Sequence, residues 1–143
     1  MLFKRIGRTS PEVAYMIVQN VSGSTMTAGY SCVFDVSASV DGVRVTQASA
    51  TDLQAYAGVV HEDLTNNSYG LVQVYGYRAS AYIYSSTGTS AAGDNLTVVA
   101  AEWGLTPATT GGTAKAFGFL AEAISASSSS QFHTTAKVFL RAL

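Results

Sequence analysis

The sequence predicts an all-β protein, mainly antiparallel, with the architecture of a small β-barrel or β-sandwich. Short runs of aliphatic and aromatic residues alternate with polar residues at the period of two that is typical of strands. Turn sequences rich in Gly, Asn, Asp and Ser separate these runs about every ten residues, the spacing expected of a sandwich or barrel. Only residues 114–126 have a composition that would also suit a helix.

The 143 residues have the length of one domain, with a basic segment at the start. Residues 1–12 are predicted to form an extended N-terminal arm, and residues 13–143 a single β-rich domain. The arm carries three basic residues, Lys4, Arg5 and Arg8. They are open to two interpretations, a solvated terminus or an arm that contacts a partner protein.

The first elements of the domain are predicted to follow one another as a meander. Residues 13–18 are apolar on both parities, which indicates a strand covered on both faces. A polar, glycine-containing turn at residues 20–29 joins this strand to another at residues 30–36. An Asp-Gly turn then leads into a short strand at residues 43–45.

One face of the strand at residues 30–36 is predicted to belong to the core. Its apolar residues of one parity are Tyr30, Cys32, Phe34 and Val36. The chain has one cysteine, so an internal disulfide is excluded. Cys32 is expected to fill core space rather than to act as a nucleophile.

Strands are also predicted at residues 56–60, 70–77 and 81–84, which are rich in Val and Tyr. Gly76 stands between two tyrosines and indicates a β-bulge or the close approach of another backbone. After the next turn, the apolar residues Leu96, Val98 and Ala100 alternate with other residues, as they do in a strand.

The last third of the chain is less regular. Residues 102–112 contain Trp, Pro and paired glycines, and they predict an irregular loop. Residues 114–126 suit a helix by composition, but the parity and interior glycine of residues 117–119 favour a strand. Residues 137–141 predict the closing strand.

Four tyrosines gather within ten residues: Tyr75, Tyr77, Tyr82 and Tyr84. They are predicted to lie partly at a contact with another protein, because their hydroxyls seek polar partners that an interface supplies. The two pairs differ in strand parity, so they face opposite sides unless Gly76 or residues 78–80 introduce a bulge. Without a bulge, one pair would belong to the core and the other to the contact, and the sequence leaves open which.

Composition narrows the possible partners. Hydrophobic residues make up 48% of the chain and charged residues only 12%, with a net charge of −1. Low charge beside many aromatic residues favours an oligomer or lattice component over a monomer. This balance gives no basis for a nucleic-acid partner, and no apolar run has the length of a membrane span. No secretory signal follows the basic N-terminus, so synthesis in a cytoplasm is expected.

No enzyme is predicted, and no catalytic, cofactor-binding or metal-binding residue. His61, Glu62 and Asp63 form the densest titratable group, but adjacent residues of an extended chain point to opposite faces. We therefore interpret them as a solvated turn. His133 has no companion at the spacing of metal ligands, and neither a nucleophile elbow nor a phosphate-binding glycine loop occurs.

Several segments resemble a known family. IVQNVSGST at 17–25, AYAGVV at 55–60 and YGLVQVYGYR at 69–78 are similar to tailed-bacteriophage head proteins called decoration or cement proteins. Residues 93–96 and 137–141 look similar too. The resemblance implies a β-rich body without catalytic residues that binds the assembled shell at subunit junctions, as a trimer or dimer, and stabilises it.

The resemblance also implies a partner and a location. The partner would be the major capsid protein of the same virus, and the protein would be made in the host cytoplasm and lie on the capsid surface of the virion. A second function stays open, a glycan- or surface-binding module of a viral fibre or tail tip, because aromatic faces stack on sugars. Binding to purified shells would favour the first function, and binding to cells or glycans without shells the second.

Overall fold

The computed structural model describes residues 12–37, 41–86, 88–108, 115–125 and 131–142. Within these residues the chain is all-β and mainly antiparallel, as predicted, and no helix could span a membrane. The strands are β1 (Val13–Asn20), β2 (Ser31–Phe34), β3 (Arg44–Thr46), β4 (Tyr56–Val60), β5 (Tyr69–Ser85), β6 (Thr89–Ser90), β7 (Asn95–Val98), β8 (Leu105–Pro107), β9 (Gly118–Leu120), β10 (Ile124–Ser125) and β11 (Phe132–Arg141).

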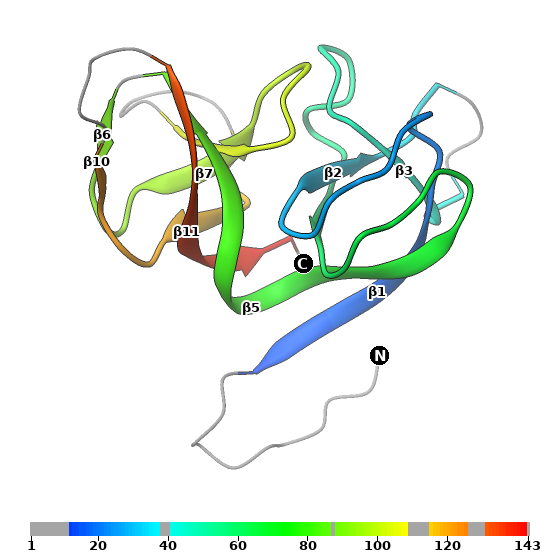
Figure 1. Cartoon of the computed structure of the whole chain (residues 1–143), viewed down its shortest axis with the longest axis horizontal. Coiled ribbons are helices and arrows are strands. Elements are labelled where there is room, and N and C mark those ends of the chain that lie inside the picture. Colours follow the sequence, from blue (N-terminus) through cyan, green and yellow to red (C-terminus); the bar gives the residue numbers. More distant parts are fainter. Residues whose placement is uncertain (1–11, 38–40, 87, 109–114, 126–130, 143) are drawn as a thin grey trace.

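The 17-residue strand β5 organises the molecule and runs across its whole width (Figure 1). Strand pairings follow two circuits that share β5. One circuit runs β1–β3–β2–β4–β5 and returns to β1, and the other runs β5–β11–β9–β7–β8 and returns to β5. The β1–β3 and β5–β8 pairings are parallel and short, so each circuit is barrel-like without being a regular barrel.

Each circuit contributes its own hydrophobic cluster. The first cluster draws on β1 to β5 and includes Val18, Cys32 and Val72. The second draws mainly on β5, β7, β8, β9 and β11. Strand β4 is buried at all five positions because Ala57 and Val60 belong to the first cluster, while Tyr56 and Val59 belong to the second.

The predicted meander is wrong, because β3 lies between β1 and β2 and pairs with β1 in parallel. The segment between β1 and β2 does not close a hairpin but folds over the loop before β5. The buried Asn20 holds it there, donating from Nδ2 to Ser24 O (2.7 Å) and Leu64 O (2.8 Å). Met26 also bridges to Leu64. These contacts satisfy the buried side-chain amide of Asn20.

Two predictions about single strands need correction. Residues 13–18 are not covered on both faces within the chain, because Val18 is fully buried whereas Ile17 is 65% exposed. In the predicted strand at residues 30–36, Cys32 is buried as predicted, but Tyr30 and Phe34 are only half-buried and Val36 is exposed. The strand ends at Phe34, so parity no longer governs Val36.

Most strands predicted after residue 55 are present in the structure. The strand at residues 56–60 is confirmed, and residues 70–77 and 81–84 belong to the one continuous strand β5. Residues 114–126 contain strands and no helix over their described part, as favoured. Strand β8 interrupts the predicted loop at residues 102–112. The arm at residues 1–12 lies almost entirely outside the described residues, and the single domain stays a prediction.

Candidate protein-contact surface

The four predicted contact tyrosines lie on one face of β5. Tyr75 and Tyr77 stand opposite Arg141 and Phe139 of β11, and Tyr82 and Tyr84 stand opposite Thr135 and His133. All four partners are odd-numbered residues of one strand and therefore share a face. The alternate residues of β11, Ala136, Val138 and Leu140, are buried in the second cluster.

A β-bulge brings the two tyrosine pairs to the same face. Arg78 pairs with Val138 and Ala81 with Ala136, so two residues of β5 stand opposite the single residue Lys137. The extra residue reverses the parity of everything that follows it. The bulge that the sequence left open at residues 78–80 is therefore present, and none of the four tyrosines is a core residue.

The first aromatic group on this face surrounds His133. Its ring meets those of Tyr82 and Tyr84 edge-on, with centroids 5.3 and 5.2 Å apart, and its Nδ1 lies 2.7 Å from Tyr82 Oη. Tyr30 continues the group from Tyr82 (5.2 Å) to Trp103, on which it stacks at 5.1 Å. Partial burial raises the pKa of the Tyr82 hydroxyl, with smaller contributions from Tyr30 and Glu102.

The second aromatic group lies nearer the C-terminus. Tyr75 meets Phe139 edge-on at 5.4 Å, and Phe139 stacks on Phe119 of β9 at 5.3 Å. The Arg141 guanidinium lies 5.6 Å above the Phe119 ring. Among the described residues, Tyr77 has no ring partner. It lies near Lys137, whose ammonium is 2.9 Å from Glu122 and whose pKa is raised chiefly by that hydrogen bond.

A second surface, which sequence reasoning missed, lies on β1 and the start of β5. Its exposed apolar side chains are Val13 (39%), Tyr15 (42%), Ile17 (65%) and Tyr69 (64%). Gln19 pairs with Tyr69 and Ile17 with Leu71, which places these residues side by side. The sequence pattern that could have indicated this surface is the run of apolar residues on both parities at 13–18. The same pattern marks a fully buried strand and a strand at an interface.

The remaining predicted residues do not assemble into a site. His61, Glu62 and Asp63 are all exposed, as expected for a solvated turn, and His61 meets the Tyr15 ring at 4.9 Å. Burial raises the pKa of the Cys32 thiol to about 12. No cluster of His, Cys, Asp or Glu among the described residues could hold a metal ion. Lys4, Arg5 and Arg8 lie outside the described residues.

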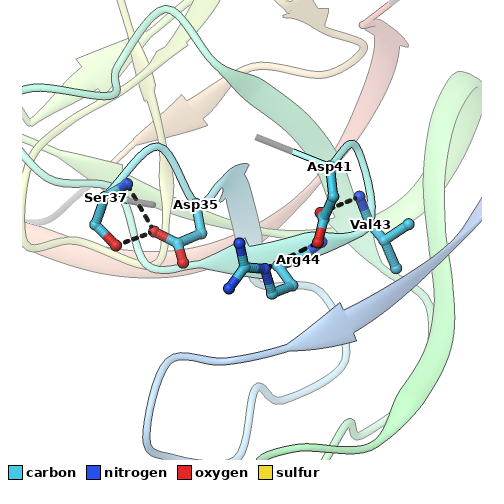
Figure 2. Close-up of polar contacts among 5 residues, drawn as sticks. All are labelled: Asp35, Ser37, Asp41, Val43 and Arg44. Carbon is cyan, nitrogen blue, oxygen red and sulfur yellow. Dashed lines mark hydrogen bonds and ion pairs between the residues drawn. The ribbon is translucent and has the colours of Figure 1, made fainter. Parts of the chain in front are cut away.

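A hollow of about 370 Å³ lies between residues 35–37, which follow β2, and residues 46–52 at the end of β3 and after it. Figure 2 shows the hydrogen bonds of Asp35, which lines the hollow, and of Asp41, which does not. Asp35 accepts hydrogen bonds from Ser37 N and Oγ, and Asp41 accepts them from Val43 N, Arg44 N and Arg44 Nε. These bonds lower the pKa of both carboxyls. Their role is to shape the turn, so we do not place the functional site here.

Comparison with solved structures finds a similar fold. One similar chain is the N base of the head fiber gp8.5 of bacteriophage phi29, known from a crystal structure. The match covers 92% of this chain and 96% of that chain, with a TM-score of 0.53 and 14% sequence identity. At this identity the likeness shows a shared fold. A scan against models of protein families finds no match, and neither does a search of curated proteins.

Proposed function

We propose that this protein is a structural component of a bacteriophage head, bound to the outside of the shell at subunit junctions and stabilising it there. The observation that carries the proposal is the fold likeness to a phage head fiber base over nearly the whole of both chains. The partner is the major capsid protein of the same virus. The protein works without catalytic chemistry or a cofactor, and its place is the virion surface.

The aromatic face of β5 and β11 supports this proposal as the shell contact. Tyrosine and phenylalanine bury a large area at small entropic cost, which suits a contact repeated over many identical copies. Tyr77 is the foremost contact residue, because it is half-buried on this face and no described ring packs against it. The basic residues Lys4, Arg5 and Arg8 add a second contact if the arm reaches a neighbouring subunit.

The alternative, a glycan- or surface-binding module of a fibre, has one observation in its favour. Trp103 stacks on Tyr30 close to Glu102 and His133, whose Oε2 and Nε2 atoms are 3.6 Å apart. Aromatic rings beside polar groups are a usual platform for sugars. The two functions differ in what the protein binds when no shell is present.

Co-sedimentation with purified shells tests the proposal. The full chain is expected to sediment with shells of the major capsid protein, and Tyr77→Ala should weaken binding about tenfold, as loss of a hot-spot side chain does. Tyr77→Phe is the matched control that keeps the ring. Replacing Lys4, Arg5 and Arg8 by Ala should weaken binding most at low salt. Binding to glycans or cells but not to shells would overturn the proposal in favour of the alternative.

A further inference from the structure

Strand β1 has one edge that the described residues leave largely uncovered. One edge pairs with β5 along the whole strand, but the other pairs with β3 only at Gln19 and Asn20. No described strand covers that second edge from Val13 to Val18, as the lower margin of Figure 1 shows. Within the described part of the chain, the sheet therefore ends there in a row of backbone donors and acceptors that no strand pairs with.

Two hydrogen bonds show which backbone groups face the free edge. Asn20 N donates to Ser68 O, on the β5 side, and Gln19 N donates to Val43 O, on the β3 side. Because backbone groups alternate along a strand, those of Tyr15 and Ile17 point the same way as those of Gln19. Beyond the end of β3, they point to the uncovered edge.

The side chains along this edge are apolar and exposed. Val13, Tyr15 and Ile17 all present their side chains to the outer face, beside Tyr69. Strand β1 contains no charged residue and no proline, and the irregularity of its pairing with β5 at Ala14 and Tyr15 places the extra residue in β5 and not in β1. Soluble proteins usually protect a free edge with a lysine, a proline or a bulge in the edge strand, so an edge without them indicates a pairing partner.

We propose that two copies of this chain associate by pairing β1 with β1 in antiparallel orientation, across a two-fold axis at Tyr15. In this register Tyr15 stands opposite Tyr15 of the partner subunit, and Val13 opposite Ile17 of the partner subunit. In this register the backbone groups that face the uncovered edge pair with each other, and Gln19 keeps its hydrogen bond to Val43 beside β3. Ala14 and Met16, which are half-buried, gain cover on the other face.

A second copy suits this edge better than an unrelated strand. Two-fold pairing requires a self-complementary surface, and an uncharged strand meets its own copy without like-charge repulsion. The whole chain carries a net charge of only −1. The pairing would also explain why residues 13–18 are apolar on both parities. The inference is independent of the proposed attachment to a shell.

Disulfide formation tests the register. The native chain has one cysteine, Cys32, which is fully buried and therefore unreactive in the folded protein. Tyr15→Cys places a thiol beside its own copy, so mild oxidation should link most of the protein into covalent dimers. Val36→Cys, at a similarly exposed position away from β1, is the control and should stay monomeric on a denaturing gel. Equal cross-linking of both variants would overturn the register.

Sedimentation measures the association itself. The full chain is expected to be a dimer at micromolar concentration, and Ile17→Lys should raise the dissociation constant at least tenfold while circular dichroism stays unchanged. Val36→Lys is the matched control and should leave the dimer intact. A monomeric wild-type chain, or a dimer or trimer that Ile17→Lys does not weaken, would overturn the proposal.

Discussion

The two aromatic surfaces of this protein differ in how far the chain itself satisfies them. On the β5–β11 face, Tyr75, Tyr82 and Tyr84 each touch another ring, and one hydroxyl is hydrogen-bonded to His133. On the β1 face, Tyr15 meets the His61 ring, but Ile17 and Tyr69 are about two-thirds exposed, and Tyr69 has no ring contact among the described residues. The aromatic residues of the first face pack largely on one another, whereas Ile17 and Tyr69 of the second face stay largely exposed.

This difference teaches that a count of tyrosines does not locate an interface. Aromatic residues that pack on one another stabilise the isolated chain, so their truncation affects folding and binding together. Exposed apolar residues along an unpaired edge contribute little to the isolated chain, so their truncation affects association alone. The following predictions separate these two behaviours.

The largest effect is expected at Gly76, which pairs with Val13 of β1 and with Leu140 of β11 and so joins the two faces. Its φ is +98°, and a Cβ there would collide with Glu12 O. Gly76→Ala should lower the free energy of unfolding by about 3 kcal/mol or more, because strain and collision add. Urea denaturation measures the loss.

Gly23→Ala is the matched control for Gly76. Its φ is +83°, but a Cβ there meets nothing within 4 Å. The substitution should cost about 1 kcal/mol from backbone strain alone. Equal losses for the two variants would show that the close approach of β1 to Gly76 does not matter.

A pH effect is expected from Cys32, in the core behind the β1 face. Its pKa is raised by burial from 9.0 to about 12, so the unfolded chain loses the thiol proton first. The stability that comes from keeping this thiol neutral and buried is complete below pH 9. It falls as pH rises toward 12, by at most about 1.4 kcal/mol per pH unit. Denaturation between pH 8 and 10.5 should therefore show a steeper fall in stability for the wild type than for Cys32→Ala. Parallel curves would contradict a buried neutral thiol.

A smaller loss is expected on the β5–β11 face. Tyr82→Ala removes ring contacts with Tyr30 and His133 and should lower the free energy of unfolding by about 1–2 kcal/mol. Tyr82→Phe keeps the rings and should lose less than half of that. An unchanged melting temperature for Tyr82→Ala would mean that this face, too, is unsatisfied without a partner.

The smallest effect on folding is expected on the β1 face. Ile17→Thr keeps a β-branched side chain at a position that is 65% exposed, so the monomer should change in stability by less than about 0.5 kcal/mol. Thermal unfolding at a concentration low enough to hold the chain monomeric measures this. A loss as large as that of Tyr82→Ala would remove the contrast between the two faces.

The strands themselves could be predicted from local pattern. Residues 56–60 were placed correctly because β-branched and aromatic residues between turns suit few other structures. Gly76 between two tyrosines correctly indicated the close approach of another backbone, and Cys32 was correctly assigned to the core. Each of these features depends on residues adjacent in sequence, for which alternation and turn chemistry carry the information.

Only the tertiary structure decided the order of the strands and the use of their faces. The insertion of β3 between β1 and β2 depends on long-range contacts such as Asn20 with Leu64, which leave no local pattern. The bulge opposite Lys137 placed all four tyrosines on one face, where strict alternation would have split them. The free edge of β1 appears only once its neighbours are known. Burial is a property of what packs against a residue, so sequence alone determined which residues are apolar and the fold determined which are covered.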